Sequence, residues 1–167
     1  MADWLGINSS HLDSHCGNSG VRKLDEALDG TDSWDHDVDE THWFILDLGV
    51  SYNITKVRGR SNTAAFGGSD PIDVNIYVST DGTTWGDAVA SGITTWQDRT
   101  DWDGDAVIDC TPKEGRYVKI EIIDTEDTDT PDGIKFGASP AFTILDVYGL
   151  FVSSAGIPIL RRRREAA

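Results

Sequence analysis

The sequence predicts an all-β fold, an antiparallel jelly-roll sandwich, on three observations. Short runs of β-branched and aromatic residues alternate between apolar and polar positions, as half-buried strands do. Gly, Asp and Asn separate these runs, which is where tight turns need them. No window of the 167 residues holds a sustained helical period. Many short strands joined by turns, with few helices, are typical of two packed antiparallel sheets.

The first half of the chain contains two neighbouring strand signals. Residues 42–48 (HWFILDL) are rich in aromatic and aliphatic residues and are followed by Gly49. Residues 53–58 (NITKVR) come next, after a short polar interruption. One short helical turn is expected earlier in the chain, at residues 21–28.

The second half contains the clearest alternation. Residues 73–79 (DVNIYVS) and 117–122 (YVKIEI) each place three aliphatic side chains on one face of a strand. An Asp81-Gly82 pair follows the first of them, and Asp-Gly is a tight-turn signal. A last strand is predicted at residues 144–149. Each of these segments has the length of an ordinary antiparallel strand.

One domain accounts for most of the chain, because 167 residues are enough for a single sizeable core. We assign residues 1–149 to the sandwich and residues 150–167 to a tail, where the composition changes. The tail contains an apolar segment at 157–160 (IPIL), followed at once by four arginines. The Gly156-Ile157-Pro158 break disfavours a helix and favours an extended arm. We expect this arm to contact a neighbouring copy, giving a homo-oligomer or larger assembly that weakens with salt.

The charge balance excludes two classes of partner. The formal net charge is −15 and the sequence pI is about 4.4. Residues 1–160 alone carry −18, since residues 161–167 hold four of the 14 basic residues and one acidic residue. Such a body repels phosphate backbones and anionic lipid, so neither nucleic acid nor a membrane is an expected partner. Plain solubility and cation binding are two alternative reasons for the acidic surface.

The sequence contains no membrane or export signal. It has no run of 18 apolar residues. Residues 1–10 (MADWLGINSS) lack the basic and apolar regions of a secretory signal.

The two cysteines, Cys16 and Cys110, are too few for a disulfide scaffold. A bridge between them would close a long loop and stabilise the fold by roughly 4 kcal/mol in the chain-entropy model. Two unlinked thiols are the alternative, and the sequence leaves both open.

Six short motifs follow one another along most of the chain. They are ALDGTDSW at 27–34, WFILDLG at 43–49, ITKV at 54–57, VSTDGTTW at 78–85, RYVKI at 116–120 and VYG at 147–149. In content and order they resemble the discoidin domain, also called the coagulation factor V/VIII C-terminal type. Its bacterial relatives are the family 32 carbohydrate-binding modules. The resemblance implies a galactose-binding-like jelly roll.

Several motif residues are expected to have structural roles. Trp43 and Trp85 are expected to pack in the core or at the sheet ends, because large aromatic rings dominate burial. Asp47 is expected to accept hydrogen bonds from backbone donors at a strand end. Tyr117 and Tyr148 are expected to be buried rings whose hydroxyls are tethered.

The resemblance implies a structural Ca²⁺ site at the turn that follows Leu28. In the family, this turn holds Ca²⁺ through a carboxylate, carbonyls and a hydroxyl, which are the hard oxygen ligands that the ion prefers. Asp29, Thr31 and Asp32 lie in this turn. The family's last strand adds a glutamate, but Ile144 stands at that position here. Asp146, on the same side of the strand, is expected to substitute for it.

The resemblance also implies a shallow sugar site at one end of the sandwich. In the family, an aromatic ring stacks on the sugar face, and Arg, Asn or His side chains bond the hydroxyls. Two long loops, 61–71 and 124–140, supply aromatic residues, and a third contribution follows the Asp-Gly turn. The candidates are therefore His36, Arg60, Asn62, Phe66 and Phe136, with Trp96 and Trp102 behind the two phenylalanines.

Two functions are left open. The first is a non-catalytic glycan-binding module, with galactose-type sugars as implied ligands, acting outside the cell or at its surface. The second is a structural subunit of a virion or cell-surface layer that uses the same fold, with the tail making inter-subunit contacts. We expect no enzyme activity, because no G-x-S-x-G, H-E-x-x-H, phosphate-loop or dinucleotide motif occurs.

Overall fold

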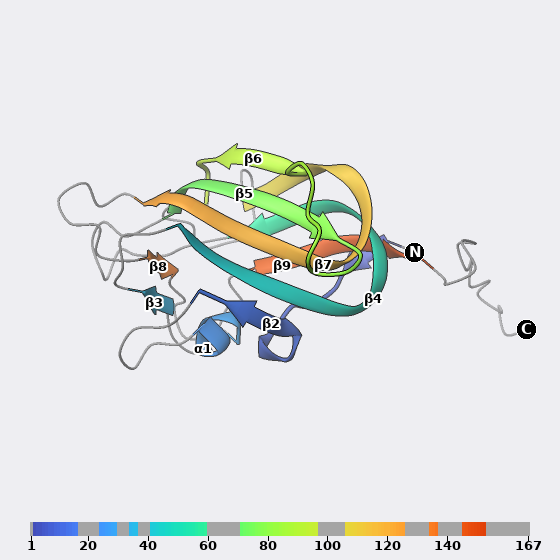
Figure 1. Ribbon diagram of the computed structural model, residues 1–167, viewed down its shortest axis with the longest axis horizontal. Coiled ribbons are helices and arrows are strands. Elements are labelled where there is room, and N and C mark those ends of the chain that lie inside the picture. Colours follow the sequence, from blue (N-terminus) through green and yellow to red (C-terminus); the bar gives the residue numbers. More distant parts are fainter. Residues whose placement is uncertain are drawn as a thin grey trace, which may run out of the picture.

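The computed structural model describes residues 2–16, 24–29, 34–36, 41–59, 71–96, 106–125, 134–136 and 145–152 (Figure 1). No helix within these ranges has the length and apolar character to cross a membrane. The elements are β1 (Ala2–Trp4), η1 (Ser9–His11), β2 (Leu12–His15), α1 (Leu24–Leu28), β3 (Trp34–His36), β4 (His42–Gly59), β5 (Pro71–Ser79), β6 (Ala90–Ile93), β7 (Val107–Thr125), β8 (Ile134–Phe136) and β9 (Leu145–Phe151).

Two long strands, β4 and β7, run through both layers of the molecule. They are antiparallel neighbours, with Phe44 opposite Ile120 in one part and Val57 opposite Ile108 in the other. The register shifts between Asp47 and Tyr52, which is where the two ribbons bend together (Figure 1). The two halves of each strand therefore lie in different layers, and one continuous sheet folds over itself.

The hydrogen-bonded partners define the two layers. One layer contains β2, the first half of β4, the second half of β7, β5 and β6. The other contains β1, β9, the second half of β4 and the first half of β7. β3 and β8 form a separate two-stranded ribbon. The predicted all-β antiparallel sandwich is confirmed.

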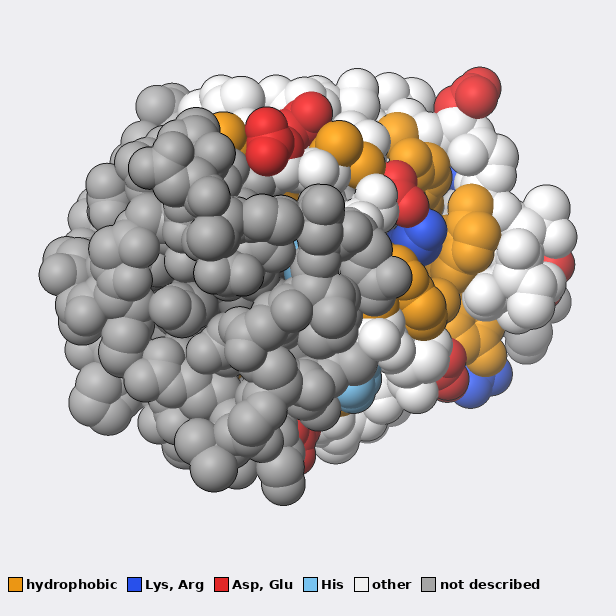
Figure 2. All heavy atoms as spheres, turned by 60° about the vertical axis from the view of Figure 1, so that its left-hand side comes forward, with side chains coloured by type: hydrophobic (Ala, Val, Ile, Leu, Met, Phe, Trp, Pro, Cys, Tyr) orange, Lys and Arg blue, Asp and Glu red, His pale blue; other side chains and the backbone are white. Residues whose placement is uncertain are grey.

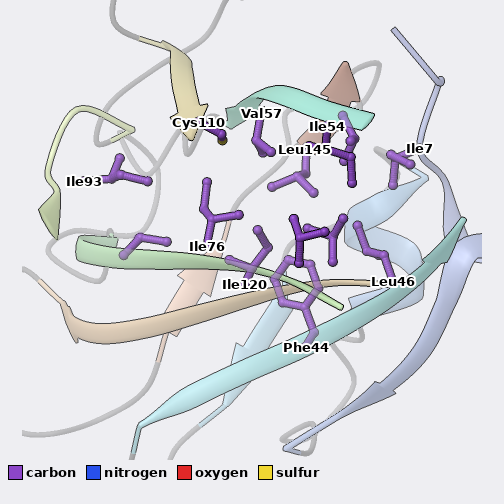
Figure 3. Close-up of a cluster of buried hydrophobic side chains, with 14 of the residues drawn as sticks. Ile7, Phe44, Leu46, Ile54, Val57, Ile76, Ile93, Cys110, Ile120 and Leu145 are labelled. Atoms are coloured by element: carbon purple, nitrogen blue, oxygen red, sulfur yellow. The ribbon is translucent and has the colours of Figure 1, made fainter. Parts of the chain in front are cut away.

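The core lies between the layers and follows the alternation in the sequence (Figure 3). Full burial of a Val, Leu, Ile or Phe side chain contributes about 1.5–3 kcal/mol each before the cost of chain ordering. The fully buried aliphatic and Phe side chains of the strands are Phe44, Leu46, Ile54, Val57, Val74, Ile76, Val78, Val118, Ile120, Ile122, Leu145 and Val147.

Two glycines permit the bends of the long strands. Gly49 in β4 has φ +76°, a left-handed conformation that side chains rarely adopt. Gly115 in β7 lies so close to the end of β5 that an added Cβ would be 2.6 Å from the carbonyl oxygen of Ser79. A side chain at position 115 would therefore prevent the close approach of β7 and β5 at the bend.

The five predicted strand segments all lie in strands. Residues 42–48 and 53–58 belong to the single bent strand β4, and the predicted helical turn is α1. The prediction missed β1, β2, β3, β6 and β8, which are three or four residues long and carry little periodicity. β9 continues to Phe151, so the first two residues assigned to the tail pair within the sheet.

The two cysteine thiols are unlinked. The Cys16 thiol accepts a hydrogen bond from the Trp43 backbone amide at 3.3 Å. Cys110 is buried in the core, and this burial raises the pKa of its thiol to about 11. Of the two alternatives that the sequence left open, the structure has the pair of separate thiols.

Candidate functional site

The bent strands bring all their free ends to one end of the sandwich, which we call the loop end. Register places Pro71 opposite Thr125 and Gly59 opposite Leu145, and β4 begins with His42 opposite Ile122. The bend itself lies at the other end, which we call the bend end (Figure 1). Segments 37–40, 60–70, 97–105, 126–133 and 137–144 therefore all connect to strands or residues at the loop end.

Two of the predicted sugar-binding residues lie on one ribbon. β3 pairs with β8, with Trp34 opposite Phe136 and His36 opposite Ile134. The fold thus joins two segments that are about 100 residues apart in the sequence, although only their backbone is described. Arg60, Asn62, Phe66 and Trp102 lie outside the described residues, and Arg60 directly follows the last residue of β4.

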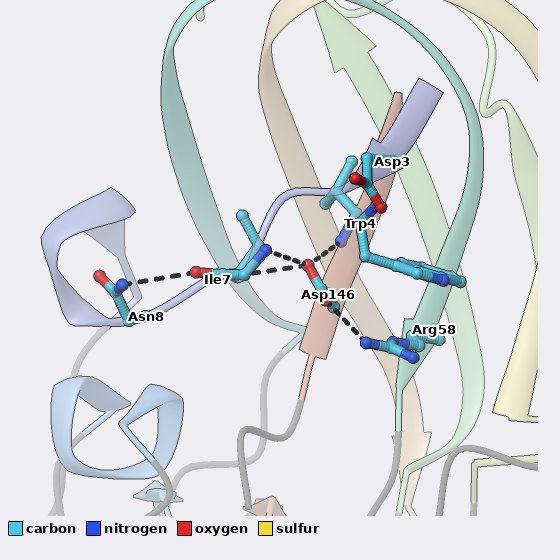
Figure 4. Close-up of polar contacts among 8 residues, drawn as sticks. Asp3, Trp4, Ile7, Asn8, Arg58 and Asp146 are labelled. Atoms are coloured by element: carbon cyan, nitrogen blue, oxygen red, sulfur yellow. Dashed lines mark hydrogen bonds and ion pairs between the residues drawn. The ribbon is translucent and has the colours of Figure 1, made fainter. Parts of the chain in front are cut away.

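A buried carboxylate, Asp146, lies beside the loop end at the start of β9 (Figure 4). Its Oδ1 accepts hydrogen bonds from the backbone amides of Gly6, Ile7 and Val147 at 2.9, 3.3 and 2.8 Å. Its Oδ2 forms an ion pair with Arg58 at 2.9 Å. The carboxylate therefore fixes the N-terminal segment and β4 to β9.

An aromatic ring covers the ion pair between Arg58 and Asp146. The Arg58 guanidinium lies 4.0 Å from the centroid of the Trp4 ring, within the range of a cation–π contact. Trp4 in turn meets Tyr148 edge to face at 5.3 Å. The sequence analysis missed Trp4 and Arg58. Arg58 had a signal, because it ends the predicted strand at residues 53–58 and lies two residues before the candidate Arg60 in the sequence.

Asp29, the first predicted calcium ligand, directly follows α1. One of its oxygens, Oδ1, accepts a hydrogen bond from the backbone amide of Ser9 at 2.8 Å, and the residue is exposed. Thr31 and Asp32 lie outside the described residues. Asp29 and Asp146 thus accept hydrogen bonds from the same N-terminal segment. The donors are the backbone amides of Ser9 and Ile7, which are two residues apart.

The predicted ligand set fits calcium only in part. Both oxygens of Asp146 are committed to hydrogen bonds, and one of them already faces a guanidinium cation. Within the described ranges, no three His, Cys, Asp or Glu residues are grouped as metal ligands would be. The calcium site therefore stays a prediction, and it rests on the turn at Asp29, Thr31 and Asp32.

Trp96, which the sequence placed behind the two phenylalanines, is a core residue. The ring is fully buried and its Nε1 donates a hydrogen bond to the carbonyl oxygen of Ala106 at 3.0 Å. It lies against Gly59, where an added Cβ would be 2.6 Å from ring carbon Cε3. Trp96 is core because it fills the space between β4 and the chain entering β7.

Of the motif aromatics expected to have structural roles, Trp43, Trp85, Tyr117 and Tyr148 are only partly buried. Trp43 and Tyr77 lie on either side of Lys119, whose ammonium is 5.9 and 5.4 Å from their ring centroids. Lys119 also pairs with Glu121 at 2.6 Å, and Glu121 accepts a hydrogen bond from the Tyr77 hydroxyl at 3.0 Å. Burial and this hydrogen bond raise the pKa of Tyr77. Trp43 is thus part of a network on the outer face of a sheet.

Two carboxylates hold turns together, the partly buried Asp47 and the exposed Asp81. Asp47 accepts a hydrogen bond from the Gly49 amide at 2.8 Å, as expected at a strand end, and it also binds Arg116 through two nitrogens. The Arg116 hydrogen bonds hold the pKa of Asp47 below its usual value. Asp81 accepts bonds from the Thr84 and Thr83 amides, which hold its pKa far below the usual range.

Five lysine and arginine side chains are described, and each of the five has a partner. Four of them pair with carboxylates: Lys56 with Asp109, Arg58 with Asp146, Arg116 with Asp47 and Lys119 with Glu121. The fifth described basic side chain, Lys113, donates to the carbonyl oxygen of Trp85 at 2.7 Å. Carboxylates and apolar side chains are prominent on the described surface beside the loop end (Figure 2).

The sequence of the loop-end segments adds to this charge. Segments 37–40, 60–70, 97–105, 126–133 and 137–144 contain 12 of the 29 acidic residues and two of the 14 basic residues. The two basic residues are Arg60 and Arg99. The segments that connect to strand ends at the loop end are therefore rich in carboxylates in their sequence.

The geometry and the motifs agree with a comparison against protein families. The model of the F5/8 type C domain matches residues 7–133, about three quarters of the chain. The chain belongs to the F5/8 type C family. This match confirms the resemblance to discoidin domains. No curated protein sequence matches the chain.

Solved structures with the same fold are carbohydrate-binding modules. Chitosan-binding module 1 of a Paenibacillus sp. IK-5 chitosanase/glucanase is 20% identical and has a TM-score of 0.61, over 88% of this chain and 99% of that one. The CBM32-3 module of a Clostridium perfringens family 31 glycoside hydrolase is 14% identical with a TM-score of 0.61, over 86% and 94%. The CBM32 of AlyQ, in complex with 4,5-unsaturated mannuronic acid, is 16% identical with a TM-score of 0.56, over 80% and 91%. At these identities the likeness shows the fold.

Proposed function

We propose that this F5/8 type C domain is a non-catalytic glycan-binding module that acts outside the cell or at its surface. The observation that carries the proposal is the convergence of the strand ends at the loop end. Loops held by a rigid sandwich are the usual place for binding residues. Structural neighbours with the same fold are named as carbohydrate-binding modules, which supports the same class of ligand here.

The ligand is bound by the residues that the sequence singled out. Arg60 and Asn62 follow β4 and supply hydrogen-bond donors for sugar hydroxyls, and His36 contributes from the β3–β8 ribbon. Phe66 and Phe136 supply apolar rings for the flat face of a sugar. Arg58 stays tied to Asp146 and supports the strand from which Arg60 extends.

The negative charge of the loop-end segments bears on which class of glycan can bind. The loop-end segments are strongly acidic, and the described cations already have partners. A polyuronate would meet repulsion, whereas a neutral galactoside or a cationic glucosamine polymer would not. The acidic loop end therefore favours neutral or cationic glycans over anionic ones. The chitosan-binding neighbour supports the cationic alternative.

Binding to a panel of soluble glycans tests the proposal. We expect weak, millimolar-class binding of galactosides or chitosan oligosaccharides by calorimetry or NMR, and no binding of uronate oligomers. Arg60→Ala should abolish the binding. Lys113→Ala is the matched control, since it removes the same charge from β7 at a distance from the loop end.

Two results would contradict the proposal in different ways. If neither neutral nor cationic glycans bind, or if Arg60→Ala binds as well as the unmodified protein, the glycan site at the loop end is wrong. If uronate oligomers bind as tightly as the others, the site stands but the charge argument fails.

A further inference from the structure

A shallow hollow of about 340 Å³ lies at the bend end of the sandwich, away from the loop end. The bends of β4 and β7 and the end of β9 form its walls, with Val50, Glu114, Arg116, Phe151 and Val152 among the lining residues. All of its lining residues belong to the described part of the chain. The proposed sugar site uses none of them.

The hollow gathers apolar surface that the fold leaves open. Val50 and Phe151 are 44% and 38% exposed, and Ile123 is the only other large hydrophobic side chain exposed to this degree among the described residues. The Phe151 ring is held in place by an edge-to-face contact with Tyr52, with centroids 6.0 Å apart. Neighbouring exposed apolar side chains on a rigid surface often mark a contact site.

The charged residues that line the hollow are Glu114 and Arg116, and of the two only Arg116 has an ion partner among the described residues. Arg116 is neutralised by its two hydrogen bonds to Asp47, and these bonds raise the pKa of Arg116. Glu114 is exposed and has no ion pair among the described residues. The surroundings of the hollow therefore favour an occupant with an apolar part and a cationic part.

The chain itself contains such a segment next to the hollow. We infer that the hollow receives the tail of the same molecule, with residues 157–160 (IPIL) against Val50 and Phe151. The four arginines at 161–164 then lie near the carboxylates around the hollow. The apolar part and the cationic part are adjacent in the tail, as the hollow requires.

The position of the last strand favours the molecule's own tail over that of a neighbour. Val152, which lines the hollow, is fixed by the hydrogen bond from its amide to the carbonyl oxygen of Ser51 at 3.0 Å. Four residues, Ser-Ser-Ala-Gly at 153–156, separate it from the apolar segment. These four residues reach about 14 Å when extended. Loops of two to five residues can reverse the direction of a chain, so four residues are enough for the tail to turn back onto the hollow. A short tether also gives a high effective concentration, which a neighbour's tail does not reach in dilute solution.

A synthetic peptide of residues 153–167 tests the inference. It should bind the protein truncated after Val152, which keeps every strand, and should not bind the full-length protein, whose own tail occupies the hollow. Val50→Glu in the truncated protein should weaken binding by about tenfold or more, the order expected when one valine-sized burial is lost. Ile123→Glu is the matched control, because that side chain is also 44% exposed but lies near the end of β7 at the loop end.

Trypsin cleavage at Arg161–Arg164 gives a second readout in the full-length chain. Val50→Glu should accelerate this cleavage, high salt should do the same, and Ile123→Glu should leave the rate unchanged. Unchanged melting curves of the two variants would confirm that both are folded.

Three results would overturn the inference. The first is that the truncated protein does not bind the peptide. The second is that Val50→Glu and Ile123→Glu behave alike. The third is that the mass of the full-length protein, measured by light scattering, rises with concentration and that Val50→Glu prevents this rise. The last result would assign the hollow to the tail of a neighbouring copy.

Discussion

The hydrogen bonds of Asp146 explain how a charged residue can be buried near the binding loops. Its two oxygens accept three backbone hydrogen bonds and one from a guanidinium, so that its charge is compensated after it leaves water. The sequence analysis predicted that Asp146, on the last strand, is a calcium ligand. It did not show that Arg58 lies opposite on the neighbouring strand, because pairing partners 88 residues apart are fixed only by the fold.

Asp146→Asn should lower the free energy of unfolding by about 2–3 kcal/mol. The amide would present an NH₂ group to Arg58 and leave the guanidinium poorly compensated. Asp109→Asn is the control, because its ion pair with Lys56 is exposed to solvent and should contribute little. Urea denaturation of the three proteins measures the difference. Equal midpoints for both variants would mean that the buried pair does not stabilise the fold.

At the scale of the elements, alternation in the sequence predicted the strands that carry the core. Residues 73–79 and 117–122 lie in β5 and β7 with the expected faces inward, because period-two alternation has one structural meaning in a half-buried sheet. Residues 42–48 and 53–58 could not be recognised as one strand, since the bend between them depends on Gly49 and on packing against β7. β3 and β8 carry only three residues each, too few for a periodic signal.

Gly115→Ala should destabilise the fold more than Gly49→Ala. A methyl group at position 115 meets Val78 and the backbone of Ser79, neither of which can move without disturbing the sheet, so we expect a loss of about 3 kcal/mol. At position 49 nothing lies within 4 Å, and only the left-handed backbone is strained, which costs about 1 kcal/mol. Thermal and chemical denaturation measure both losses. The reverse order would show that backbone conformation, and not close packing, limits the bend.

On the scale of the whole molecule, the two proposals place the glycan and the tail at opposite ends of the sandwich. The bent strands send their connections to the loop end, while Ala2 lies opposite Leu150 toward the bend end, so the chain enters and leaves near the bend. A ligand at the loop end and the tail at the bend end would therefore not compete. The predicted calcium turn at Asp29 belongs to neither end alone, since Asp29 holds the N-terminal segment that runs from β1 to β2.

Calcium should therefore act on global stability through that segment. We propose that Ca²⁺ binds the turn at Asp29, Thr31 and Asp32, and a hundredfold excess over Kd would stabilise the fold by about 2.7 kcal/mol. For a domain of this size the melting temperature should rise by several degrees, and EDTA should reverse the rise. Asp29→Ala should remove the calcium response. Asp146→Asn should melt at a lower temperature but keep the calcium response, because Arg58 and the backbone amides already occupy that carboxylate.

A melting curve that is the same in EDTA and in excess Ca²⁺ would show that this turn binds no calcium. A response lost equally in both variants would instead make Asp146 a ligand, as the sequence first suggested.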